Sequence, residues 1–189
     1  MKRKIIRACA AAAASLCIAF STSPVASAKE KLESQGMVPV DSPLSYEYNY
    51  TIGFSPFYTP QMIMNGADAH FKDTFPFPSN CAPFNDLPPV HSPTYSCDLY
   101  FLGTTNPVAI VNRTPTSFTF KSLPGHSEGA GRYIRFTFSS GSMWTHQMKV
   151  EGWGPWTLAA ATSIQTGAVN GFWTTYAKNL NQWINGGKL

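Results

Sequence analysis

The most regular pattern of apolar and polar positions in the chain runs from Thr166 to Ile184. Apolar or aromatic residues recur there at steps of three, four and one, which is typical of one face of an α-helix. These residues are Val169, Phe172, Trp173, Tyr176, Leu180, Trp183 and Ile184. Polar residues occupy the opposite face, and Gly186 and Gly187 follow as a stop signal. Because such a helix needs an apolar surface to cover, the pattern predicts a C-terminal helix packed on a sheet.

Alternation of apolar and polar residues earlier in the chain predicts β-strands. Three tyrosines alternate with polar residues between Leu44 and Ile52, which indicates a half-buried strand with its rings facing inward. Further strands are predicted at 98–102, 108–111, 116–122, 132–138 and 147–151. The first two of these are apolar on both parities, which favours central strands. Separators at 103–107, 113–115 and 139–142 have hairpin length, so neighbouring strands should be antiparallel.

Two shorter helical segments are also predicted. Thr59 followed by Pro60 is typical of a helix start, and helical spacing then continues to residue 71. Residues 158–164 are interpreted as an early part of the final helix, which is kinked near Gly167. The resulting fold class is α+β, with a curved antiparallel sheet of five to seven strands packed on a long C-terminal helix.

Residues 1–28 have the pattern of a signal peptide. A basic start is followed by an apolar run from Ala8 to Phe20 and by Ala-Ser-Ala at 26–28, which predicts cleavage after Ala28. The apolar run is shorter than the roughly 20 residues of a membrane-spanning helix. We therefore expect a secreted, extracellular protein without a membrane span. Residues 29–43 are interpreted as a flexible leader and 44–189 as a single α+β domain.

Removal of the signal changes the charge balance. Four of the 14 Lys and Arg residues lie before position 8, so ten remain against 10 Asp and Glu. A net charge near zero argues against nucleic acid as a partner. No cofactor is indicated, and a monomer is expected.

Two cysteines, Cys81 and Cys97, remain after the predicted cleavage. In an oxidising compartment such a pair is expected to form a disulfide, which closes the loop 74–97. This loop holds six prolines and should lack regular structure. A cysteine nucleophile is not expected, because both thiols would be bonded to each other.

The loop 123–131 most resembles a site, because His126 and Glu128 lie among three glycines between two predicted strands. Their side chains could serve as polar contacts or as an acid/base pair, or the loop could be a structural hairpin. Arg132 follows on the parity of Ile134, so it either reaches solvent or enters the core beside an anionic partner. The four histidines lack ligand spacing, so neither metal ligands nor catalytic residues are assigned.

The order of one strand, a short helix, several antiparallel strands and a long final helix resembles the helix-grip architecture of the START-like (SRPBCC) superfamily. That resemblance implies a sheet wrapped round the last helix, with an apolar cavity between them for a lipid-like or aromatic ligand. The segment Thr-Pro-Thr-Ser-Phe-Thr-Phe-Lys-Ser-Leu-Pro-Gly-His-Ser-Glu-Gly-Ala-Gly at 114–131 is also similar to uncharacterised exported actinobacterial proteins, a resemblance that implies no activity.

The leading hypothesis is a secreted, non-enzymatic domain that binds a small apolar or lipid-like ligand between the sheet and the C-terminal helix. Aromatic walls would remove apolar area from water, and His126 or Arg132 would orient a polar end. The candidate ligand-binding residues are Tyr48, Tyr50, Phe118, Phe120, His126, Arg132, Phe136, Trp173, Tyr176 and Leu180.

Two alternatives stay open. One is a secreted protein-binding factor, an inhibitor or effector, that uses the proline-rich loop and exposed tryptophans. Trp153 and Trp156, which bracket Gly154 and Pro155, are the tryptophans most expected to be exposed. The other is a hydrolase-like enzyme with a site near His126 and Glu128.

Overall fold

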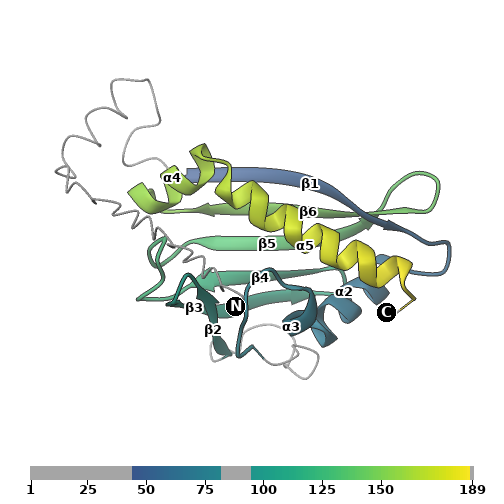
Figure 1. Cartoon of the computed structure of the whole chain (residues 1–189), viewed down its shortest axis with the longest axis horizontal. Helices are drawn as coiled ribbons and strands as arrows, with labels where there is room; N and C mark the ends of the chain where they lie inside the picture. The colour runs from purple at the N-terminus through teal and green to yellow at the C-terminus, as the bar shows by residue number, and fades with distance from the viewer. Residues whose placement is uncertain (1–43, 82–94, 188–189) are drawn as a thin grey trace, which may run out of the picture. The chain divides into compact units, whose positions relative to one another are not determined.

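The computed structural model describes residues 44–81 and 95–187. The predicted signal peptide, the leader 29–43 and residues 82–94 of the proline-rich loop lie outside these described residues. Six strands form one antiparallel sheet in the order β1-β6-β5-β4-β3-β2 (Figure 1). They are β1 (Leu44–Phe54), β2 (Ser96–Phe101), β3 (Thr104–Thr114), β4 (Ser117–Ser122), β5 (Tyr133–Ser140) and β6 (Thr145–Gly154).

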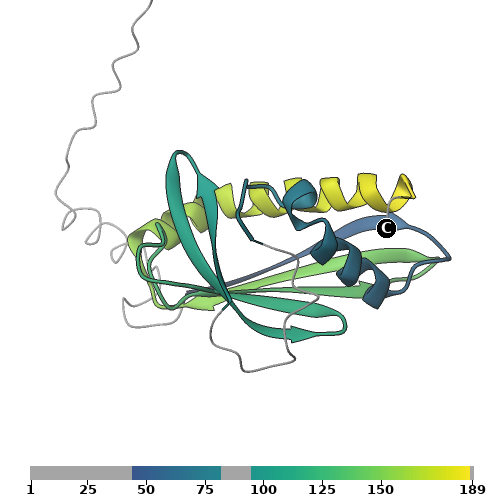
Figure 2. The same cartoon turned by 90° about the horizontal axis from the view of Figure 1, so that it is seen from below.

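The sheet curves toward the side that carries the C-terminal helix. Figure 2 shows the β2–β3 hairpin leaving the plane of the other strands and rising toward that helix. The pairing of β3 with β4 shifts register between Ile110 and Asn112. A bulge of this kind bends a strand and increases its twist. The first two strands along the chain, β1 and β2, form the two edges of this curved sheet.

Four helices within the described residues accompany this sheet. They are α2 (Pro60–Ala69), α3 (Phe71–Thr74), α4 (Leu158–Gln165) and α5 (Ala168–Asn185). The 18-residue helix α5 lies across one face of the sheet (Figure 1). Its buried stripe confirms the predicted one at Val169, Trp173, Tyr176, Leu180 and Ile184. A curved antiparallel sheet packed on a long C-terminal helix is the helix-grip arrangement, so the predicted fold class is confirmed.

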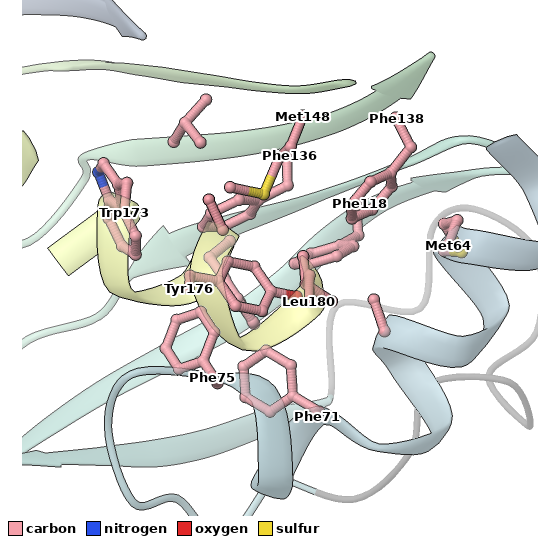
Figure 3. Close-up of a cluster of buried hydrophobic side chains, with 14 of the residues drawn as sticks. Met64, Phe71, Phe75, Phe118, Phe136, Phe138, Met148, Trp173, Tyr176 and Leu180 are labelled. Carbon is pink, nitrogen blue, oxygen red and sulfur yellow. The ribbon is translucent and has the colours of Figure 1, made fainter. Parts of the chain in front are cut away.

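Aromatic rings fill the space between α5 and the sheet. Figure 3 shows Tyr176 and Leu180 from α5 pointing into a cluster that includes Phe118 and Phe136 from the strands and Phe75 after α3. The rings of Phe136 and Tyr176 meet edge to face, with centroids 5.5 Å apart. Burial of one such side chain contributes about 1.5–3 kcal/mol. The middle of α5 is therefore held by a closely packed core.

Two strand predictions are corrected. Residues 104–107, predicted as a hairpin loop, belong to β3, because Leu102 and Gly103 alone make the turn with φ angles of 48° and 75°. The segment at 98–102, predicted as a central strand, forms the edge strand β2. Its apolar residues on both parities do not indicate burial on both faces, since Tyr100 stays 41% exposed.

The helix starts agree better with the sequence. Thr59 caps α2 by accepting a hydrogen bond from the backbone N–H of Met62 at 3.2 Å. The predicted helix to residue 71 divides at His70 into α2 and α3. The kink expected near Gly167 is a complete break, because Gly167 has a left-handed φ of 74° between α4 and α5.

The prediction that Trp153 and Trp156 are exposed is wrong. Trp153 and Trp156 are both half-buried, and the ring of Trp153 stacks on that of Tyr133 at 5.4 Å. The tryptophan with the greatest exposure among the described residues is Trp144, at 63%. Tyr133 stands opposite Trp153 on the neighbouring antiparallel strand and covers its ring, a pairing that the sequence around Gly154 and Pro155 does not reveal.

The two cysteines fix the described ends of the proline-rich loop. The Sγ atoms of Cys81 and Cys97 are 2.03 Å apart, at disulfide distance as predicted. Asn80 adds a side-chain hydrogen bond to the backbone N–H of Asp98 at 2.6 Å. Among residues 44–81 and 95–187, none of the helices has both the length and the apolar character needed to cross a membrane.

Candidate functional site

A cavity of about 380 Å³ lies between the sheet, α4 and the first half of α5. Its size falls within the range of small-molecule sites, roughly 300–1,000 Å³. Most of its walls are apolar, formed by Tyr46, Phe77, Leu99, Phe101, Leu102, Ile134, Ala159, Ala168, Val169, Phe172 and Trp173. Polar groups from Asn106, His126, Ser127, Glu128 and Ser163 complete the lining. The cavity thus combines an apolar body with a polar region built largely from one loop.

Three phenylalanines form the outer wall of the cavity. Phe77, Phe101 and Phe172 come from the segment after α3, from β2 and from α5. Their ring centroids are 4.9 to 5.1 Å apart and each pair meets edge to face. None of the three was predicted as a site residue, although Phe172 was predicted on the apolar face of the final helix. The isolated bridge between Ser79 and Leu99 supports this wall, so the described start of the proline-rich loop helps to build the cavity.

The inner wall joins α5 to β1. Nε1 of Trp173 donates a hydrogen bond to the hydroxyl of Tyr46 at 3.2 Å. Burial raises the pKa of Tyr46 above its ordinary value, so the hydroxyl stays neutral in the physiological range. Opposite Tyr46 on the neighbouring strand stands Gly152, whose missing side chain leaves room for the tyrosine ring.

The loop 123–131 is anchored on two sides. The backbone N–H of Ser127 donates to Oδ1 of Asn106 at 3.0 Å, and Oγ1 of Thr157 donates to the carbonyl of Glu128 at 2.7 Å. Gly129 has a φ of 92°, and a Cβ there would lie 2.8 Å from Cγ2 of Thr157. Glycine is therefore required for the close approach of this loop to α4. The contacts hold the polar residues of the loop against the cavity.

His126 contacts the cavity as a neutral imidazole. Its Nδ1 accepts a hydrogen bond from the backbone N–H of Glu128 at 3.2 Å. Burial lowers the pKa of His126 below its ordinary value, an effect that the Glu128 carboxylate partly opposes. In the neutral ring an accepting Nδ1 places the proton on Nε2. No hydrogen-bond partner for Nε2 is found among the described residues, so this N–H is a donor for a bound molecule.

Glu128 is held by contacts within the protein. Its Oε1 accepts a hydrogen bond from Oγ of Ser163 at 2.7 Å, and its Oε2 lies 3.9 Å from Nε of Arg132. Within the described residues, no hydrogen bond joins the Glu128 carboxylate to the imidazole of His126. The sequence left open an acid/base pair of these two side chains, but the two groups are not in direct contact for proton transfer.

Arg132 enters the core side of the sheet and is only 4% exposed. Its guanidinium donates to the carbonyl oxygens of Pro155 at 2.5 Å and Leu44 at 3.5 Å and faces Glu128. The second of the two predicted placements, beside an anionic partner, is the one observed. These contacts engage the guanidinium within the protein. Arg132 thereby balances the charge of Glu128 and links three segments of the chain.

The predicted binding residues fall into three groups. His126 and Trp173 line the large cavity, and with Phe120 and Arg132 they also line an adjoining cavity of about 30 Å³. Four others, namely Phe118, Phe136, Tyr176 and Leu180, are buried in the core and line neither cavity.

Tyr48 and Tyr50 form the third group, on β1 and also outside both cavities. The hydroxyl of Tyr50 donates to Oδ1 of Asn170 at 2.6 Å, which joins β1 to α5. Periodicity placed these side chains on the correct face of the sheet, but the open space lies beyond them, beside α4. Binding of a ligand by any of the ten residues stays a prediction.

Residues 125–129 read Gly-His-Ser-Glu-Gly and match the Gly-x-Ser-x-Gly pattern of hydrolases, so the sequence-based interpretation that this pattern is absent is wrong. In those enzymes the serine stands on a sharp turn from a strand into a helix. Here the segment connects the antiparallel strands β4 and β5. Ser127 is exposed, and no histidine hydrogen-bonds its hydroxyl within the described part of the chain. The match therefore lacks the structural context of a nucleophile.

Within the described residues, no group of three His, Cys, Asp or Glu side chains could hold a metal ion.

No protein-family model matches the chain, and no curated protein matches it either. Solved structures do resemble it. Protein MLL2253 from Mesorhizobium loti is 11% identical with a TM-score of 0.52, and the match covers 78% of this chain and 100% of that one. Protein XoxI from Bacillus cereus is 12% identical with a TM-score of 0.50, and the match covers 75% and 94%.

At such low identity these likenesses show the fold alone. They agree with the element order and the sheet-on-helix packing described above. The predicted helix-grip architecture is thereby confirmed, and a relation to the START-like superfamily stays a prediction. The chain has an α+β fold of the helix-grip type, shared with these bacterial proteins.

Proposed function

We propose that this protein binds a small, mostly apolar ligand with one neutral polar end in the cavity between α5, α4 and the sheet. The observation that carries the proposal is the cavity itself, about 380 Å³ in volume, apolar over most of its walls and polar at the loop 123–131. Removal of apolar ligand surface from water would contribute about 25 cal/mol per Å². A lipid-like or aromatic molecule has this distribution of surface.

The polar region favours a neutral hydrogen-bond acceptor on the ligand. Nε2 of His126 offers a donor, whereas Glu128 and Arg132 compensate each other within the protein. A ligand hydroxyl, ketone or ester oxygen could accept from the imidazole without a formal charge of its own. A ligand carboxylate would lie beside Glu128, and none of the described residues that line the cavity is an uncommitted cation, so we expect it to bind more weakly.

The proposed role is binding and not catalysis. The Glu128 carboxylate is engaged by Ser163 and Arg132, and Ser127 lacks a histidine partner among the described residues. We further propose that the protein is exported, with residues 1–28 removed as a signal peptide. The disulfide-distance pair Cys81 and Cys97 supports an oxidising compartment.

Filling the cavity tests the proposal directly. Ala159 and Thr162 both lie on α4 and are both exposed, but Ala159 lines the cavity and Thr162 does not. We expect Ala159→Trp to weaken binding of a fluorescent long-chain alcohol by at least about tenfold, which corresponds to about 1.4 kcal/mol. Thr162→Trp, which adds the same bulk outside the cavity, should leave the affinity unchanged. Equal affinity of the two variants would count against the cavity as the binding site.

A second arm tests the polar end. His126→Phe keeps a ring of similar size but removes the Nε2 donor. We expect it to weaken the alcohol probe by about three- to tenfold and to leave a hydrocarbon probe of equal length unaffected, because one neutral hydrogen bond is worth about 0.5–1.5 kcal/mol. An equal loss for both probes would show that His126 acts through packing alone.

A further inference from the structure

Four large apolar side chains are exposed together at the end of the sheet away from α4. Phe54 is the last residue of β1 and Phe57 lies in the connection from β1 to α2, while Met143 and Trp144 lie in the turn between β5 and β6. Their exposed fractions are 55%, 82%, 80% and 63%. Figure 1 shows both connections at the same end of the sheet. We call these four residues the apolar tip.

Hydrogen bonds fix the two halves of the apolar tip to each other. The backbone N–H of Ser55 donates to the carbonyl of Trp144 at 3.0 Å, and Nε2 of the buried His146 donates to the carbonyl of Ser55 at 2.9 Å. Phe54 also pairs with Thr145 at the end of the β1–β6 ladder. The exposed side chains are therefore displayed by one rigid unit, although they are about 90 residues apart in sequence.

The turn that displays Met143 and Trp144 is strained. Their φ angles are 50° and 63°, and the backbone N–H of Thr145 donates to the carbonyl of Ser142 at 3.1 Å. Positive φ at both central positions is the signature of a type I′ turn, for which Asn-Gly is the favoured pair. Two bulky side chains in this conformation cost stability, and strain of this kind concentrates at functional positions. Folding alone does not account for a methionine and a tryptophan here.

The two segments that carry the apolar tip are uncharged. Segments 53–67 and 139–148 contain no Asp, Glu, Lys or Arg, and the one histidine between 139 and 148 is buried. Protein interfaces commonly combine aromatic anchors with a charged or strongly polar rim. Projecting aromatic and methionine side chains without charge match instead the interfacial region of a lipid bilayer, where tryptophan is favoured.

We propose that the apolar tip inserts into the interface of a lipid bilayer and docks the protein on membranes of neutral surface charge. Phe54, Phe57 and Met143 supply apolar area, and Trp144 sits at the headgroup level. This inference is independent of the cavity, which lies at the other end of the sheet beside α4. Since no charged group takes part, the affinity for vesicles should change little with salt concentration.

The test uses the full chain and vesicles of phosphatidylcholine. Met143→Asn combined with Trp144→Gly supplies the residues that a type I′ turn prefers. We expect this double variant to float with vesicles at least about tenfold more weakly while its unfolding midpoint rises. The matched control is Tyr100→Ser, which removes an exposed aromatic ring from β2 and should bind vesicles as the unmodified chain does. Because the apolar run 8–20 is present in all of them, differences between variants report on the apolar tip.

A positional readout completes the test. Phosphatidylcholine with brominated acyl chains should quench the tryptophan fluorescence of the bound chain, and Trp144→Phe should remove most of that quenching while vesicle binding persists. Undiminished quenching in Trp144→Phe, equal binding of the double variant and the unmodified chain, or binding only to anionic vesicles would each overturn the proposal. A dimer in solution that the double variant abolishes would assign the apolar tip to a second copy of the chain and would overturn it as well.

Discussion

Trp173 and Tyr46, 127 positions apart in the chain, share a hydrogen bond of 3.2 Å at the inner wall of the cavity. The indole N–H of Trp173 donates and the hydroxyl of Tyr46 accepts. Trp173 is buried and lies on α5, whereas Tyr46 lies on the edge strand β1. The bond therefore ties the helix to the sheet at the point where the cavity interrupts their packing.

Removing this acceptor should cost stability. In Tyr46→Phe the buried indole N–H of Trp173 loses its partner, which costs about 1–3 kcal/mol. Urea unfolding monitored by circular dichroism measures the change. Tyr48→Phe is the matched control, because Tyr48 is also half-buried on β1 and its hydroxyl has no recorded hydrogen bond among the described residues. A loss of the same size in both variants would show that the hydroxyl at position 46 has no special role.

The space beneath the Tyr46 ring gives a second prediction. A Cβ on Gly152 would lie 2.2 Å from Cε1 of Tyr46, so Gly152→Ala forces the ring to move. Overpacking of this kind costs about 1–3 kcal/mol. Gly171 on α5 has no atom within 4 Å of such a Cβ, and Gly171→Ala should stabilise the protein by about 0.5–1 kcal/mol through helix propensity. Thermal unfolding of both variants should therefore shift in opposite directions, and a shift of equal sign would contradict the prediction.

The sequence revealed much of the fold, because period and local chemistry are encoded in neighbouring residues. The alternation of Tyr46, Tyr48 and Tyr50 gave β1 and its inward face, and Thr59 gave the start of α2. The stripe ending at Ile184 gave the buried face of α5. The extent of β3 was missed, because the turn at Leu102 and Gly103 is tighter than the separator suggested.

The position of the cavity could not be read in the same way. Periodicity shows which side chains face inward, but it does not show how completely they fill the space. The rings of Phe136 and Tyr176 meet edge to face and fill the space between the sheet and the middle of α5. The open volume therefore lies farther along, beside α4. Small residues there, Ala159 and Ala168, were the signal available in the sequence, since alanines leave space that the aromatic stripe fills elsewhere.

The pairing of Arg132 with Glu128 could not be predicted from the sequence either. Strand parity correctly offered an inward guanidinium, but the partner lies across a glycine-rich turn whose path the sequence does not define. Because Arg132 is only 4% exposed, its positive charge depends on the Glu128 carboxylate as a counter-charge.

Neutralising Glu128 should therefore destabilise the protein. Glu128→Gln keeps an oxygen that can accept from Ser163 but leaves Arg132 buried without a counter-charge, which we expect to cost about 1.5–3 kcal/mol. Glu47→Gln is the matched control, because Glu47 lies 3.8 Å from Lys149 in an exposed pair worth less than about 1 kcal/mol. Chemical denaturation measures both, and equal effects would place Arg132 in a better solvated setting than its burial indicates.

The pH dependence of stability should show two separate windows. Burial lowers the pKa of His126 below its ordinary value, so the unfolded chain binds this proton more readily than the folded protein. The free energy of unfolding is then highest above about pH 6.5 and falls on acidification until the folded imidazole also protonates. A hydrogen bond from Arg135, supported by Lys149, lowers the pKa of Glu151 below 4.5, so its contribution is lost only at lower pH. His126→Asn, which keeps an acceptor for the Glu128 N–H, should flatten the first window alone, and Glu151→Gln the second alone. Urea titrations between about pH 3 and 8 resolve the two, and a first window that persists in His126→Asn would assign that slope to another group.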